Sequence, residues 1–250
     1  MPGLGKKTFT AGDVLIAGDV NNFLMDQTVM VFATAAARTA AIPTPSQGMT
    51  TYRSDINALE IYNGAAWLGA TGLTGVAPTS IANTGGTASM SGITTTFAGV
   101  TSLSLNGVFR TGFRNYRIIL EATSTTTVAW FSARLRTAGT DNNSASYNLV
   151  SVQTANDTAL TRVSNVNLTL FDNFVLIGDR KLLATIDIST PFASDQTLLG
   201  YQSSTGAAGV GSKNNSVAGA ARFNNTTSFD GISFFGATFT GNVIVYGYNQ

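Results

Sequence analysis

The sequence predicts a mainly β protein, in which a C-terminal β-sandwich or jelly-roll-like domain follows a small N-terminal module of helix plus β-hairpin. Two observations lead to this class. Only 11% of the 250 residues are charged, against about a quarter in typical soluble domains, and 26 residues are glycine. Many short apolar segments with alternating side chains are also separated by turn clusters, which is typical of sandwiches and jelly rolls.

Residues 96–250 contain the clearest strand patterns. Apolar and polar side chains alternate over residues 116–120 and again over residues 242–246. A turn cluster at residues 139–143 separates two such segments. We therefore expect one β-sandwich domain over residues 96–250.

The N-terminal segment, residues 8–42, has a helical pattern. Apolar residues recur at spacings of three and four, and the alanine-rich stretch 33–41 has high helix propensity. Pro43 ends the helical pattern, because a proline disfavours the helical conformation of the residue before it. The helical residues that we expect to serve attachment or self-association are Val14, Leu15, Val20, Phe23, Leu24 and Val31.

A β-hairpin is predicted over residues 48–68. Strands at 49–52 and 58–62 flank a turn at 54–57, and Asn63-Gly64 is a second strong turn signal. Residues 69–95 then shift to Gly, Thr and Ser with almost no charge, which indicates a linker. The expected organisation is an attachment module at 1–68, a linker at 69–95 and a head domain at 96–250, so that a fragment starting near Phe97 should fold.

The composition excludes several classes of function. The chain has no cysteine and no histidine, which excludes disulfides, Cys/His zinc sites and serine–histidine catalysis. The chain has only 13 acidic residues, and most of those in the sandwich flank turns, so we expect no catalytic pair, no metal site and no cofactor. A formal net charge of +1 does not indicate the basic surface that nucleic-acid binding requires. No apolar run approaches the length of a membrane span.

Aromatic residues beside polar loops give the best hint of recognition. Tyr147 and Tyr201 border loops rich in Asn or Ser, and Asn142 and Asn143 lie in one of these loops. Exposed rings can stack on sugars while amides bind the hydroxyl groups. These four residues are the candidate receptor contacts, and the alternative that the rings fill the core stays open.

The N-terminal quarter resembles the N-terminal module of small bacteriophage tail or head-fibre proteins, often called minor tail proteins. The matching segments are FTAGDVL (9–15), DVNNFLMDQ (19–27), VMVF (29–32), AAAR (35–38), AIPTP (41–45), GMTTY (48–52), Leu59, YNG (62–64) and Trp67. The segments NYRI (115–118), LRTAGTD (135–141) and VYG (245–247) resemble, more loosely, the sandwich domains that such proteins carry.

This resemblance implies a place in the virion, symmetric and most often trimeric assembly, and a role in host contact or particle decoration. The favoured function is a tail or head fibre protein, anchored by residues 1–68, whose β-sandwich points away from the particle and binds the bacterial surface, with a surface glycan as one expected ligand. Its expected partners are its own copies and other virion proteins. The alternative is an architectural role, such as capsid decoration or a baseplate or neck adaptor, without receptor binding. An envelope-degrading hydrolase is a third, less favoured reading.

Overall fold

A computed structural model describes residues 10–14, 16–20, 29–69, 72–124, 128–154, 160–178, 181–206 and 215–249. The chain divides into two compact units, with the boundary between Thr74 and Gly75, and we call them unit 1 and unit 2. Most of the described residues lie in antiparallel strands, so the predicted mainly β class is confirmed. None of the helices in these ranges is long and apolar enough to cross a membrane.

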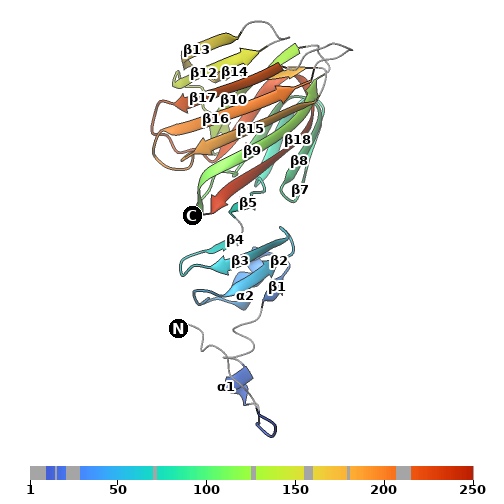
Figure 1. Ribbon diagram of the computed structural model, residues 1–250, viewed down its shortest axis with the longest axis vertical. Helices are drawn as coiled ribbons and strands as arrows, with labels where there is room; N and C mark the ends of the chain where they lie inside the picture. Colours follow the sequence, from blue (N-terminus) through green and yellow to red (C-terminus); the bar gives the residue numbers. More distant parts are fainter. Residues whose placement is uncertain are drawn as a thin grey trace. The chain divides into compact units, whose positions relative to one another are not determined.

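Unit 1 is a four-stranded sheet, in the order β1-β2-β3-β4, with a short helix (Figure 1). Strand β1 runs parallel to β2, and the other neighbours are antiparallel. Its elements are α1 (Ala17–Asp19), β1 (Met30–Phe32), α2 (Ala35–Ala41), β2 (Thr50–Arg53), β3 (Ala58–Tyr62) and β4 (Trp67–Gly69), and β5 (Leu73–Gly75) follows at the boundary.

The expected hairpin is present, with β2 and β3 joined by a turn at residues 54–57, and β4 extends it. The expected helical segment over residues 8–42 is only partly correct. Helix α2 agrees with it: the Thr34 hydroxyl caps the helix by accepting from the Ala37 N–H at 3.2 Å, and the helix ends one residue before Ile42. Residues 30–32 are instead a strand, because backbone pairing with β2 outweighs the helical spacing there.

The interior of unit 1 is built on charge rather than on apolar packing. Arg38 from α2 forms a buried ion pair with Glu60 on β3, and its guanidinium lies 4.6 Å from the centre of the Trp67 ring. Arg53 bonds to Asp55 at 2.7 Å and also reaches Glu60. Among the described residues of unit 1, Ile42 is the one buried apolar side chain.

Unit 2 is a β-sandwich. Its strands are β6 (Ser80–Thr84), β7 (Thr87–Ser91), β8 (Thr94–Asn106), β9 (Phe113–Ser124), β10 (Val128–Thr137), β11 (Thr140–Asp141), β12 (Tyr147–Thr154), β13 (Thr161–Leu168), β14 (Phe171–Gly178), β15 (Leu182–Ser189), β16 (Thr197–Thr205), β17 (Asn215–Phe223) and β18 (Gly231–Asn249). One layer runs β9-β15-β16-β17-β12-β13, and β10 and β14 belong to the other (Figure 1).

Two long strands take part in both layers. The first half of β18 lies between β10 and β8, and its second half pairs with β9 and with the start of β8. The pairing register shifts between Phe235 and Phe239, where the strand changes layer. Strand β8 is divided in the same way, with β6 along its end and β7 along its beginning.

The core between the layers is aromatic. Side chains alternate strictly between buried and exposed along β16, as expected for a sheet with one face in the core. Phe239 meets Phe97 and Phe131 edge-on, with ring centres 5.3 and 4.6 Å apart. Tyr116 closes the adjacent corner, because its hydroxyl accepts from the Arg110 N–H at 2.7 Å and donates to the Arg110 carbonyl at 2.8 Å.

The linker predicted over residues 69–95 is wrong for most of its length. Strands β6 and β7 occupy this range and pair one after the other with β8, so that β7 and β8 form a hairpin and β6 continues along the end of β8. Gly85 and Gly86, with positive φ angles of 71° and 44°, form the break between β6 and β7 and lie against Gly99 of β8. A low-charge Gly/Thr/Ser composition therefore encodes edge strands here, because threonine and serine fit a half-exposed sheet as well as they fit a loop.

The strand pairings predict different behaviour for two fragments. We expect residues 75–250 to unfold cooperatively as an isolated fragment, because this range contains every strand of unit 2 from β6 onward. We expect residues 97–250 to lose cooperative unfolding. This fragment lacks β6, β7 and residues 94–96 of β8, which pair with β18. Circular dichroism followed during heating measures both. Equal cooperativity of the two fragments would contradict this role of β6 and β7.

Candidate functional site

The outer face of the layer β9-β15-β16-β17-β12-β13 is the candidate site. Residues that lie opposite one another on neighbouring strands form rows across this face. One row consists of Arg117, Asp187, Gly200, Ala220 and Val150. The rows on either side of it consist of Ile119, Thr185, Gln202, Ala218 and Val152, and of Asn115, Ser189, Leu198, Arg222 and Asn148.

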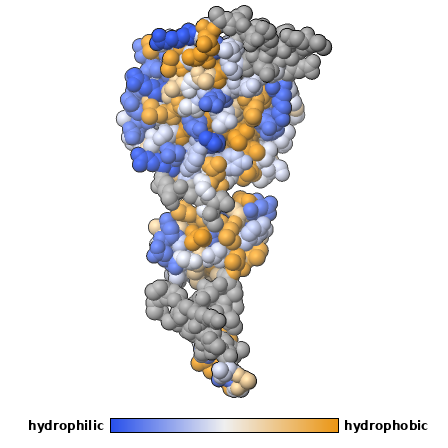
Figure 2. All heavy atoms as spheres, in the orientation of Figure 1, coloured by the Kyte–Doolittle hydropathy of each residue, from blue (hydrophilic) through white to orange (hydrophobic). Residues whose placement is uncertain are grey.

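Three open depressions adjoin one another on this face, and we call them together the trough. The first has a volume of about 440 Å³ and lies over Asn115, Ser189 and Leu198. The second, of about 470 Å³, lies over Arg117, Thr185 and Gln202, and it shares Asp187 and Gly200 with the first. The third, of about 300 Å³, lies beyond Leu198 against Val150, Val166 and Arg222. Figure 2 shows unit 2 as a mixture of apolar and hydrophilic surface.

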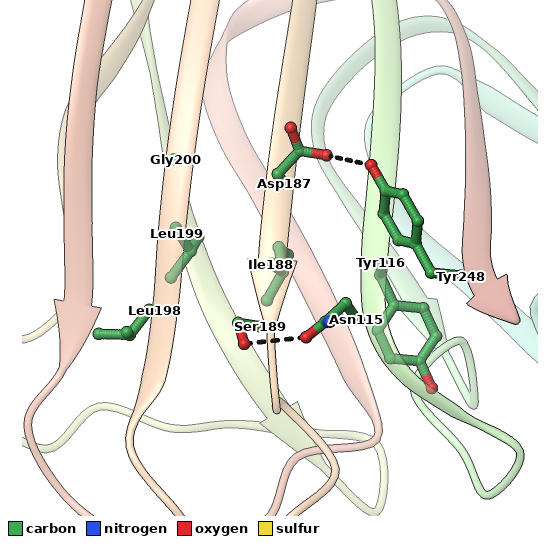
Figure 3. Close-up of a pocket in the computed structure, with 9 residues that line it drawn as sticks. All are labelled: Asn115, Tyr116, Asp187, Ile188, Ser189, Leu198, Leu199, Gly200 and Tyr248. Atoms are coloured by element: carbon green, nitrogen blue, oxygen red, sulfur yellow. Dashed lines mark hydrogen bonds between the residues drawn. The ribbon is translucent and has the colours of Figure 1, made fainter. Parts of the chain in front are cut away.

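An ion pair with an aromatic neighbour forms one wall of the trough. Arg117 donates from Nε to Asp187 Oδ1 and from Nη2 to Oδ2, both at 2.8 Å. The Tyr248 hydroxyl donates to Asp187 Oδ1 at 3.0 Å, and its ring lies 5.9 Å from the Arg117 guanidinium carbon. Beside them, Ser189 donates to Asn115 Oδ1 at 2.9 Å (Figure 3). The side chains of Arg117 and Asp187 stay 37% and 47% exposed, so a ligand can reach both.

These contacts fix the charge of the wall. The hydrogen bonds from Arg117 hold the pKa of the Asp187 carboxyl below its usual value. Burial, and then the hydrogen bond to Asp187, raise the pKa of Tyr248 above its usual value. At neutral pH the wall therefore carries one positive charge, one negative charge and a protonated phenol.

Small residues make the floor of the trough. Gly200, Ala218 and Ala220 are exposed and lie on neighbouring positions of β16 and β17. A Cβ added at Gly200 would meet no atom within 4 Å, so the hollow above it is open. Gly219 supports the floor from the inside, because a Cβ there would lie 2.5 Å from the Tyr201 ring.

Acidic groups are scarce in the described lining of the trough. Among the described residues that line the three depressions, Asp187 is the one carboxylate, and glycoside hydrolysis requires two. No group of three or more acidic residues that could hold a metal ion occurs within the described ranges.

The structure corrects the expectation that Tyr147 and Tyr201 are exposed contacts. Tyr147 is fully buried, packs edge-on against Phe171 and Phe223, and donates to the Asn142 carbonyl at 2.8 Å. Burial raises its pKa far above the usual value. Tyr201 is 3% exposed and lies beneath the trough floor. Both rings fill the core, because each occupies an inward position of an alternating strand.

The two predicted asparagines lie in the loop between β11 and β12. Asn142 is half-buried, and its Oδ1 accepts from the Ser144 N–H at 3.0 Å and from the Ser144 hydroxyl at 2.7 Å, which makes it a turn residue. Asn143 is exposed. None of the four predicted contact residues supplies an exposed side chain to the trough. In the sequence, the alternation Leu198-x-Gly200-x-Gln202 could have indicated an exposed strand face with a small residue at its centre. The residues of β9 and β15 that lie beside it can be identified only from the strand order.

Unit 1 carries a second exposed surface, which we call the unit 1 face. It consists of Val31, Tyr52, Leu59, Ile61 and Leu68, on the side of the sheet opposite Glu60. Val31 is 69% exposed, and the face has no charged residue. Of the other predicted attachment residues, Val14 is exposed and Val20 is half-buried. Leu15, Phe23 and Leu24 lie outside the described residues.

The comparisons with known proteins add no name to either surface. No protein-family model and no curated protein sequence matches the chain.

The shifted pKa of Asp187 predicts a pH-dependent contribution to stability. Because its folded-state pKa lies below the usual 3.8, the pair with Arg117 stabilises the fold above that pH and ceases to do so as the pH falls through the folded-state pKa. We expect Asp187→Asn to lower the melting temperature slightly at pH 7 and to equal the wild type near pH 2. A difference that persists unchanged at pH 2 would show that the ion pair is not its source.

Proposed function

We propose that this chain is a structural protein of a bacteriophage virion, a tail or head fibre or minor tail protein. Unit 1 attaches it to the particle and to its own copies, in a homotrimer, and the trough of unit 2 contacts the host surface. The chain acts by binding and not as an enzyme. Weak contacts repeated on one particle then add through their high effective concentration.

One observation carries the proposal: the two units expose surfaces of different chemistry. The unit 1 face is apolar and uncharged, which suits a permanent interface that remains closed to water. The trough mixes an ion pair, amides and small apolar residues, and it is open, which suits a contact that forms and dissociates. An anchored protein that recognises an external surface needs one of each.

Unit 1 also has a physical need for a partner. Apart from Ile42, the described apolar side chains of this unit are only partly buried or exposed. Small units with little core depend on oligomerisation or on another external source of burial. The resemblance of residues 9–67 to phage attachment modules points to the same end of the chain.

The architectural alternative has one observation in its favour. Near the free edge of the layer, Val150, Val152 and Val166 are between 41% and 64% exposed. Another virion protein or a neighbouring copy that covered this apolar end would make unit 2 a decoration or adaptor domain without a receptor.

The attachment surface is tested by placing charge on it. We expect the double variant Val31→Asp, Ile61→Asp to be missing from purified particles, because two carboxylates would have to be desolvated in the interface. Both side chains are exposed, so the isolated protein should retain its circular dichroism spectrum. Mass spectrometry of gradient-purified particles measures incorporation.

Leu183→Asp is the matched control, because Leu183 is 48% exposed on the outer face of unit 2 and outside the three depressions. It should be incorporated normally. Incorporation of the double variant together with exclusion of the control would reverse the proposed polarity of the chain.

A further inference from the structure

We propose that the two depressions that share Asp187 and Gly200 bind an uncharged, hydroxyl-rich saccharide chain. This inference rests on the proposed function, since it names the class of ligand for the same surface. It depends on three properties of the trough: its charge, its hydrogen-bonding groups and its floor.

Charge selects against ionic ligands. The charged side chains that line these two depressions are Arg117 and Asp187, and they neutralise each other through two hydrogen bonds. An anionic ligand would have to compete with Asp187 for the guanidinium, and a cationic ligand would have to compete with Arg117. A neutral ligand meets no such cost.

The hydrogen-bonding groups that remain available are of both kinds. Arg117 Nη1 and the Asn115 amide can donate, because the bonds within the wall use other atoms of these side chains. Asp187 Oδ2 receives one bond from Arg117 and keeps a lone pair, so it can accept. The exposed Gln202 amide offers a donor and an acceptor together. Sugar hydroxyls donate and accept at once, so they match such a mixed set.

The floor supplies the apolar part of the site. Sugar rings present C–H groups on their faces, and Gly200 with Ala218 forms a low surface against which such a face can lie. The row of Gln202 and the row of Leu198 are four residues apart along β16, a span of about 13 Å. The two depressions can therefore hold more than one ring of a chain that runs along the strand.

A protein segment fits these two depressions less well. Docked peptides gain most of their affinity from apolar anchors or from backbone pairing at a sheet edge. Asp187 and Gly200 lie on β15 and β16, inside the layer, where both neighbouring strands are already paired. The exposed large apolar side chains of this face gather toward its other end, where Val150 and Val166 lie, and Leu198 stands at the border between the first and third depressions.

The experiment fills the hollow without disturbing the fold. Gly200→Val directs a side chain into space that is empty in the wild type, and valine favours a strand. The matched control is Ser204→Val, which adds the same side chain to the same face of β16, outside the depressions. The full-length proteins are applied to a printed array of bacterial surface polysaccharides, neutral and anionic, after their thermal unfolding is shown to equal that of the wild type. If Gly200→Val unfolds, Gln202→Ala takes its place.

We expect wild type and Ser204→Val to be retained on at least one neutral polysaccharide, and Gly200→Val to be weakened there by about 10-fold or more. Asp187→Asn, which is expected to melt slightly below the wild type and is assayed well below its melting temperature, should also lose neutral binding and gain retention on anionic polysaccharides, because Arg117 is then uncompensated. Binding of the wild type to anionic polysaccharides alone, no retention on any neutral one, or equal retention of Gly200→Val would each overturn the inference.

Adsorption of particles to host cells separates this inference from the proposed function. Particles that carry Gly200→Val are compared with particles that carry Ser204→Val. Reduced adsorption without neutral polysaccharide binding would leave the receptor role in place and refute the ligand class. Unchanged adsorption together with intact incorporation would refute the receptor role of the trough itself.

Discussion

The pairing of β18 with both layers is the constraint on which the rest of unit 2 depends. Its first half is hydrogen-bonded to β10, and its second half continues the sheet of β9 and β15. Phe239 lies just after the change of layer, between Phe97 and Phe131, so the bend is packed on both sides by rings. The position of Tyr248 beside Asp187 follows from this path, because nine residues later the same strand borders the trough.

The trough exists because large side chains of β16 point into the core and the outward positions are left to other residues. Along β16 every inward residue is buried, which leaves Leu198, Gly200 and Gln202 free of any role in the core. Tyr201 fills the space below, and Gly219 accommodates its ring. Small outward residues above large inward ones produce a hollow surface without an internal cavity. A substitution in the hollow can therefore change the shape of this surface and leave the stability of the fold nearly unchanged.

The sequence could predict the class of fold and several elements, for reasons that are local. The turn at 54–57, helix α2 and the alternation in β9 and β18 all depend on neighbours within a few residues. Strand β1 could not be distinguished from a helix, because its pairing with β2 is set about twenty residues away. Strands β6 and β7 resemble a linker in the sequence, since strands that pair only with β8 at the edge of the sheet need no apolar face. The trough was missed because Arg117, Asp187 and Gly200 become neighbours only through the strand order.

Unit 1 joins its strands to its helix through Arg38 and Glu60, and it places its apolar residues on the outside. If a partner covers that face, as the proposed function requires, the stability of unit 1 rises with the concentration of the partner. On that proposal, an unassembled copy opens more often than an assembled one and is more accessible to proteases. The small apolar core of unit 1 would then favour the removal of copies that have not been assembled.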